Sequence, residues 1–182
     1  FVFPWLGSRF EKTFGGVTGF TPYRDTVHIF ISPEGFSFQS FKETLVHECN
    51  HSTFFRFHSS KTLRDVLIFE GLAENFREEI LGIRTTRWSH AISGRQCKKI
   101  LNSLRGALAS KDHQLYRHVF FGGGPYKRWT GYAIGYRIVQ TFRQTNPTLS
   151  WQEIMRMEPR EIFALSPFTK NKEHNEPEPL CS

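Results

Sequence analysis

The sequence has no long apolar run and only three cysteines. None of its segments approaches the roughly 20 consecutive apolar residues of a membrane-spanning helix, so no transmembrane segment is predicted. The cysteines, Cys49, Cys97 and Cys181, are widely spaced and form no Cys-x-x-Cys pair. Neither a disulfide framework nor a thiolate zinc site is therefore predicted. A reducing compartment is favoured.

The sequence also lacks a starting methionine and a recognisable leader. It begins with Phe1, and segment 1–7 is too short and lacks the basic start of a secretory signal. We expect the chain to be a fragment or a processed form. A cytoplasmic location is favoured, while secretion stays open. The glycine run 122–124 lacks the Lys-Ser/Thr that follows in a phosphate-binding loop, so no nucleotide is expected.

What the sequence does have is the material for one folded domain. Its 182 residues fit one core, and 38% of them are hydrophobic and 15% aromatic. The net charge of +7 raises nucleic acid, an anionic surface or an acidic substrate as partners. Because the Lys and Arg residues are scattered and lack an aromatic RNA-binding pattern, nucleic acid is not favoured. We expect a single domain over 1–166 and a flexible polar tail over 167–182.

Hydrophobic periodicity predicts an α+β fold that is mainly helical. Alternating β-branched and aromatic residues predict a small N-terminal antiparallel sheet from segments 16–20 and 26–31. Apolar residues at three- and four-residue spacing predict helices over 36–60, 63–80, 97–108 and 129–145, with short helices from about 151 and 159. Capping boxes are predicted at Thr62 and Ser150. The sheet is expected to pack on the first of these helices.

The strongest chemical signal is the HExxH sequence 47–51 within the first long helix. His47 and His51 are a little more than one turn apart, so both rings lie on one face, as two ligands of one tetrahedral zinc require. Glu48 starts beside them, where it can take a proton from a zinc-bound water and pass it to a leaving amine. The alternative is a solvated helical face that carries these residues by chance. Cys49, between the two ligands, is expected to point into the core.

A zinc ion held by two histidines needs a third protein ligand, and the second helix offers Glu70. Eighteen residues separate Glu70 from His51, enough for a turn and a return toward the metal. Glu74, one turn further on, could accept a hydrogen bond from a ligand imidazole, and Gly71 would let this helix approach a neighbour closely. The alternative is two exposed acids on an ordinary helix. An unpaired Glu is costly to bury on an apolar face, which favours the metal site.

Together these motifs resemble those of the gluzincin metallopeptidases, in which two His and a downstream Glu hold zinc. The sequence context is most similar to a bacterial family described as predicted zinc-dependent proteases of unknown function. The matching segments span most of the chain and are 15–19, 47–51, 70–74 and 131–139. The resemblance implies a Zn²⁺ cofactor, Glu48 as general base, and hydrolysis of a peptide or protein substrate.

Peptide hydrolysis also needs a group that stabilises the oxyanion opposite the metal. The candidates are Tyr132, Tyr136 and His90, and Tyr136 is preferred. The alternative for each tyrosine is a core residue with a tethered hydroxyl. By analogy with gluzincins, the strand 26–32 could offer an open edge to which an extended peptide adds by main-chain hydrogen bonds.

The sequence is also compatible with two functions other than proteolysis. One is a zinc-binding protein that is proteolytically silent. The other is a basic interaction module that binds nucleic acid or an acidic partner, with or without metal. We favour the zinc metallopeptidase because HExxH and the downstream Glu together supply a ligand set and a base.

Overall fold

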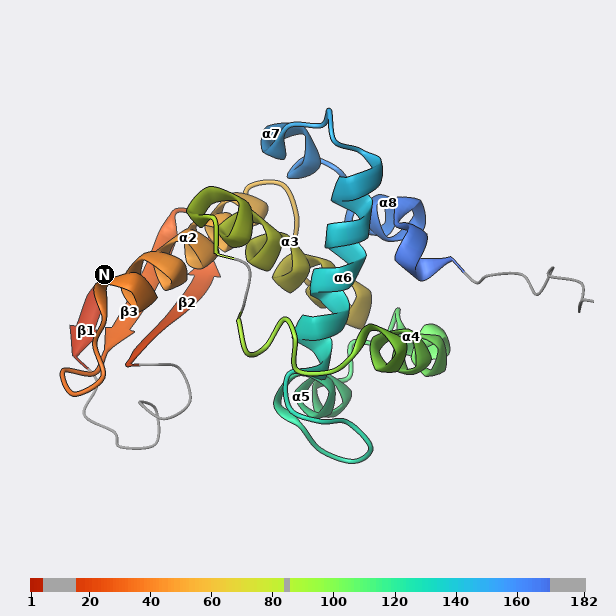
Figure 1. Cartoon of the computed structure of the whole chain (residues 1–182), viewed down its shortest axis with the longest axis horizontal. Helices are drawn as coiled ribbons and strands as arrows, with labels where there is room; N and C mark the ends of the chain where they lie inside the picture. The colour runs from red at the N-terminus through yellow and green to blue at the C-terminus, as the bar shows by residue number, and fades with distance from the viewer. Residues whose placement is uncertain (5–15, 84–85, 171–182) are drawn as a thin grey trace, which may run out of the picture.

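The computed structural model describes residues 1–4, 16–83 and 86–170. Figure 1 shows a small sheet at one end, with α2 (Phe38–Phe54) lying along it, and a helical body at the other end. The long helix α3 (Leu63–Leu81) packs against both α2 and the body. The predicted α+β class, mainly helical with a small sheet on the first long helix, is confirmed. Within the described ranges no helix is long and apolar enough to cross a bilayer.

The sheet is mixed, whereas the sequence predicts an antiparallel one. β2 (Val17–Tyr23) and β3 (Thr26–Ile31) form the expected antiparallel pair, but β1 (Val2–Pro4) pairs with β3 in parallel. A strand of three residues carries too little periodicity to be predicted, and its pairing with β3 is non-local. The strand order is β1-β3-β2, so β3 is the central strand. The open edge predicted for 26–32 is therefore wrong, and β2 is an edge strand of the sheet.

The remaining helices form the body. They are α4 (Gly94–Ser103), α5 (His113–Phe121), α6 (Thr130–Thr145), α7 (Trp151–Ile154) and α8 (Pro159–Leu165), with 3₁₀ turns at Arg105–Ala107 and Pro167–Thr169. The capping boxes at Thr62 and Ser150 are confirmed, and each cap typically contributes about 1 kcal/mol. The helix predicted over 36–60 ends at Phe54, where the chain turns. Helix α5 is not among the helices predicted from the sequence.

The closest helix contact joins α3 to α6. A Cβ on Gly71 would lie 2.3 Å from the Gly135 carbonyl oxygen, and a Cβ on Gly135 would lie 2.2 Å from the Leu67 carbonyl oxygen. Only glycine at both positions lets the two backbones approach this far. Asn75 bridges the same two helices, because its Nδ2 donates to the carbonyl oxygens of Gly71 (2.8 Å) and Tyr136 (3.0 Å). The predicted close approach at Gly71 thus occurs, and its partner is α6.

The chain stays part of the folded body for a few residues after α8. Ser166 and Thr169 are buried, and Ser166 Oγ donates to the Ile138 carbonyl oxygen at 2.8 Å. The 3₁₀ turn Pro167–Thr169 packs against α6. The first residues of the predicted tail therefore belong to the folded body. The rest of that tail, 171–182, lies outside the described residues, as do Cys181 and Gly15.

Candidate metal centre

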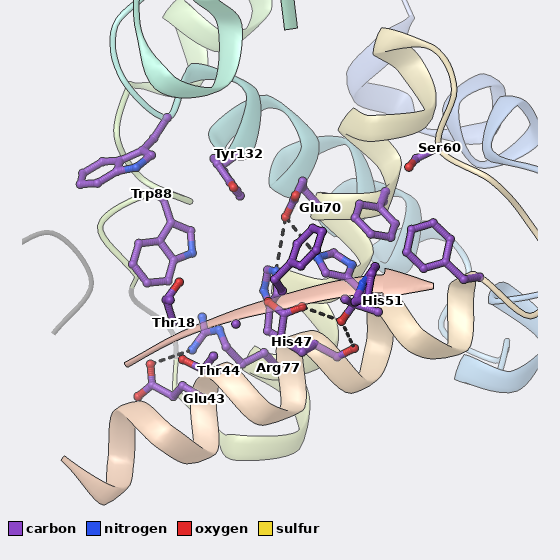
Figure 2. Close-up of a pocket in the computed structure, with 18 of the residues that line it drawn as sticks. Thr18, Glu43, Thr44, His47, His51, Ser60, Glu70, Arg77, Trp88 and Tyr132 are labelled. Carbon is purple, nitrogen blue, oxygen red and sulfur yellow. Dashed lines mark hydrogen bonds and ion pairs between the residues drawn. The ribbon is translucent and has the colours of Figure 1, made fainter. Parts of the chain in front are cut away.

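The two histidines of HExxH lie on the face of α2 that meets α3. Figure 2 shows Glu70 reaching from α3 toward both imidazole rings. Glu70 Oε2 lies 3.3 Å from His47 Nε2 and 3.4 Å from His51 Nε2. One ligand atom from each of the three residues lies within 4.8 Å of the other two. The structure thus brings together the three side chains that the sequence singles out.

The cluster has the dimensions of a zinc site. With bonds of about 2.1 Å, neighbouring ligand atoms of a tetrahedral zinc are about 3.4 Å apart, which matches the contacts of 3.3 and 3.4 Å. Glu70 Oε2 is buried and makes no hydrogen bond of good geometry within the described part of the chain. A buried carboxylate oxygen in this state is costly unless another group binds it. The three side chains therefore fit Zn²⁺ as ligands.

The charges of the cluster are strongly coupled. Burial would lower the pKa of His47, but contacts with Glu70 and Glu74 raise it to about 10. Burial would raise the pKa of Glu70, but the charge of His51 and the contact with His47 lower it to about 2. The pKa of Glu74 is also lowered, because the contact with His47 outweighs burial. Without a metal, His47 is protonated at neutral pH, so a metal that binds there must displace a proton.

A series of polar contacts starts at Nδ1 of His47, the ring nitrogen that does not face Glu70. Its Nδ1 lies 2.8 Å from Glu74 Oε1. The other oxygen of Glu74 accepts a hydrogen bond from Thr86 Oγ1 (2.9 Å) and lies 3.4 Å from Arg77 Nη2. Arg77, only 1% exposed, also contacts Glu43 Oε2 at 3.4 Å. A carboxylate behind a ligand imidazole fixes the ring orientation and its tautomer, and Glu74 occupies that position.

Glu48 is buried between α2 and β2. Thr21 Oγ1 donates to Glu48 Oε2 at 2.6 Å. Gly19, on the same strand, leaves the room that the side chain needs, because a Cβ there would lie 2.2 Å from Glu48 Cγ and 2.6 Å from Oε1. Thr21 and Gly19 thus position the Glu48 carboxylate, which lines the cavity described next.

The cluster opens into a cavity of about 540 Å³. Its floor is α2, one wall is β2, and the opposite wall comes from α3, α5 and α6. Aromatic side chains make up much of the remaining lining, and these are Phe20, Phe55, Phe69, Trp88, Tyr116, Phe121, Trp129 and Tyr132. A concave, largely apolar site with a few convergent polar groups is the usual form of a substrate site.

The structure separates the two candidate tyrosines. Tyr132 lines the cavity and points into it beside Glu70 (Figure 2). Tyr136, one turn further along α6, instead donates its hydroxyl hydrogen to Glu78 Oε2 at 2.6 Å and lines a second cavity together with His90. Tyr136 and His90 are therefore not brought together with the metal cluster.

Tyr116, which is not among the residues predicted from the sequence, lines the same cavity from α5. The spacing of Leu115, Tyr116, Val119 and Phe120 is that of an amphipathic helix, so this signal could have been found. Sequence reasoning also misplaced Cys49, which is exposed rather than buried in the core. Two residues from each histidine, Cys49 lies on the opposite face of α2, which is turned toward solvent at this point.

The chain is similar to two proteins of Bacillus subtilis, both described as uncharacterized. The chain is 27% identical to the uncharacterized protein YjfC of Bacillus subtilis over 167 residues, which cover 83% of this chain and 53% of YjfC. It is 26% identical to the uncharacterized protein YjaZ of the same organism over 141 residues, which cover 74% of this chain and 53% of YjaZ. The chain thus spans about half the length of these curated relatives. No solved structure matches it significantly.

The family assignment covers the cluster and most of the fold. A single family model matches residues 8–164, a range that contains His47, Glu48, His51 and Glu70. The chain therefore belongs to the family described as "Predicted Zn-dependent protease (DUF2268)".

Proposed function

We propose that the chain is a zinc-dependent metallopeptidase that hydrolyses peptide bonds. The observation that carries this proposal is the convergence of His47, His51 and Glu70 at the base of an open cavity, with Glu70 Oε2 at the edge length of a zinc tetrahedron from both imidazole nitrogens. Glu48 lines the same cavity. A ligand set, a general base and room for a substrate are the three parts that this chemistry requires.

The protein side chains have distinct roles in this proposal. His47, His51 and Glu70 would hold the metal, and Glu74 would fix His47 through the contact at 2.8 Å. Zinc, when bound, would polarise the scissile carbonyl and make a nearby water more acidic. Glu48, oriented by Thr21, takes the proton of the attacking water and passes it to the leaving amine.

Tyr132 is the proposed donor to the oxyanion that forms on the scissile carbonyl. Burial, and next the charge of Glu70, raise the pKa of Tyr132 well above its usual range. The hydroxyl therefore keeps its proton at neutral pH and can donate it in a hydrogen bond. Tyr116, whose pKa is raised to about 12 by burial and by Glu70, is a second donor on the same wall.

The backbone of β2 is proposed to bind the substrate main chain. Residues Thr18–Pro22 of this edge strand line the cavity beside the metal cluster. An extended peptide can add to such an edge through backbone hydrogen bonds. In this proposal the open edge that binds the peptide belongs to β2, and not to β3 as predicted from the sequence.

Metal analysis combined with peptide-library cleavage tests this function. The wild type should bind one zinc ion per chain and cleave peptides, whereas Glu48→Gln should keep zinc and lose cleavage. Glu78→Gln, outside this cavity, is the matched control and should keep both. A cleaving Glu48→Gln variant would remove the assigned base. Zinc binding without cleavage by the wild type would support the proteolytically silent alternative instead.

A further inference from the structure

We propose that the cavity binds a polypeptide across the metal cluster, so that the enzyme is an endopeptidase with a preference for acidic residues at one outer end of its cleft. This inference rests on the proposed peptidase function. It adds the class of substrate: a peptide that is cut at an internal bond, whether its ends are blocked or lie far from that bond.

The first argument is the length of the cavity on either side of the metal cluster. Ser40 and Phe55 both line it, and along α2 they are about 22 Å apart at the rise of an α-helix. His47 lies near the middle of this distance. An extended peptide advances about 3.3 Å per residue, so about seven residues fit, with about three on each side of the scissile bond.

The second argument is that the cavity continues into another. A second cavity of about 420 Å³, here called the outer cavity, adjoins the cavity at the His47, His51 and Glu70 cluster, here called the inner cavity. Four residues line both, namely Ser60, Phe69, Glu70 and Tyr116. Figure 2 shows Ser60 at one end of the inner cavity and Thr18, Glu43 and Thr44 at the other, with His47 and Glu70 between them. The metal cluster thus lies within a longer cleft rather than at a closed end of it.

The third argument concerns the groups that could hold a chain terminus. An exopeptidase needs a free charge that receives the terminal ammonium or carboxylate of its substrate. Outside the metal cluster and Glu48, the charged residues among the described lining of the inner cavity are Glu43 and Arg77. Arg77 Nη1 lies 3.4 Å from Glu43 Oε2, and Arg77 is 1% exposed. The other oxygen of Glu43 accepts a hydrogen bond from Gln39 Nε2 at 2.8 Å, and Arg77 Nη2 also lies 3.4 Å from Glu74 Oε2. Both charges are thus engaged within the protein, so neither is free to receive a terminus.

The outer cavity, in contrast, is lined by exposed positive charges. Lys61 and Lys111 line it and are exposed, while Asp112 is the one acidic residue besides Glu70 in its described lining. Asp112 Oδ1 accepts the hydrogen bond of Gln114 N at 2.8 Å and so caps α5. The two lysines therefore leave a positive charge at the outer end, which favours acidic side chains of a bound peptide.

A peptide pair that differs only at its ends tests the inference. An octapeptide with an acetylated N-terminus and an amidated C-terminus should be cut at an internal bond by the zinc-loaded protein. Its kcat/KM should equal that of the free-ended octapeptide within about twofold, and should fall as the peptide is shortened below about six residues. Cleavage of the free-ended peptide alone, or release of single terminal residues, would overturn the inference while leaving the peptidase function intact.

Binding separates failure of the inference from failure of the proposed function. Zinc-loaded Glu48→Gln should bind the blocked octapeptide in calorimetry more tightly than a blocked tripeptide. If the wild type cleaves nothing but this length dependence is present, the cleft is a peptide-binding cleft and the peptidase function is wrong. If neither peptide binds and neither is cleaved, both proposals are wrong.

The acidic preference has its own variants. Replacing glutamine by glutamate at the outer substrate positions should lower KM of the wild type by about 1.4- to 5-fold, the range for exposed ion pairs. The double variant Lys61→Ser/Lys111→Ser should lose this difference in KM. Lys99→Ser, which removes an exposed charge of α4 outside both cavities, should keep it. Equal KM values for the two peptides in the wild type would overturn the preference.

Discussion

The side chain of Glu48 lies directly against the Cα of Gly19. A Cβ at that position would approach Glu48 Cγ to 2.2 Å, closer than two carbons can come without a bond. Gly19→Ala is therefore expected to displace the Glu48 carboxylate from its hydrogen bond with Thr21. We expect cleavage to fall by about 10²-fold, as is typical when a catalytic group shifts by about 1 Å.

Zinc content separates this effect from general damage in Gly19→Ala, because the ligands lie on α2 and α3 and should still bind the metal. Gly106→Ala is the matched control, since a Cβ there meets nothing within 4 Å. Full activity in the Gly19→Ala variant would contradict the position assigned to Glu48.

The two tyrosines of α6 should differ sharply when each loses its hydroxyl. Tyr132→Phe should lower kcat by about 10²- to 10³-fold, the usual effect of removing one oxyanion donor. Tyr136→Phe should leave kcat unchanged and lower the free energy of unfolding by about 1 kcal/mol, because it removes the hydrogen bond to Glu78. Steady-state kinetics and urea unfolding of both variants check this, and the reverse result would restore Tyr136 as the donor.

Glu74→Gln tests the carboxylate behind His47. The variant keeps the shape of the side chain but loses the charge that lies 2.8 Å from His47 Nδ1. We expect zinc affinity to fall by about 10- to 100-fold in competition with a chelator. Glu79→Gln, whose parent carboxylate contacts Arg143 on the surface, should bind zinc like the wild type. An unchanged zinc affinity in Glu74→Gln would show that Glu74 does not orient His47 for metal binding and only forms an ion pair with Arg77.

The metal-free protein should be most stable in mildly acidic solution. The pKa of His47 is raised from 6.5 to about 10, so its contribution to stability is full below pH 6.5 and is lost as the pH rises toward 10. The pKa of Glu70 is lowered from 4.5 to about 2, so its contribution is full above pH 4.5 and is lost as the pH falls toward 2. Urea midpoints of chelator-treated protein should therefore be highest between about pH 4.5 and 6.5.

Saturating zinc should shift this profile upward, because zinc binds the deprotonated form of His47. The gain in the urea midpoint on adding zinc should increase from pH 6 to pH 9. A metal-free protein whose stability rises steadily over that same interval would contradict the coupling of His47 to Glu70 and Glu74.

The sequence was sufficient for the parts of the site that depend on local geometry. His47, Glu48 and His51 follow from the spacing of one helix, and Glu70 with Glu74 from the spacing of the next. The pairing of β1 with β3 depends on contacts between distant segments, which no local pattern encodes. It was therefore missed.

The sequence could not show which of Tyr132 and Tyr136 lines the cavity, for a similar reason. Both tyrosines lie one turn apart on α6, so periodicity places them on the same face. Which of them reaches the metal cluster depends on where α6 crosses α3. That crossing is set by Gly71 and Gly135, whose contact brings Tyr136 next to Glu78 instead.

The contact between Gly71 and Gly135 also determines how Glu70 and Tyr132 are positioned relative to each other. Gly71 directly follows Glu70, a proposed metal ligand, and Gly135 lies three residues after Tyr132. The point at which two backbones touch is thus within one helical turn of both a metal ligand and the proposed oxyanion donor. The separation and relative rotation of α3 and α6 at this point are set by contact between main-chain atoms. Such a contact allows less variation in position than one between flexible side chains.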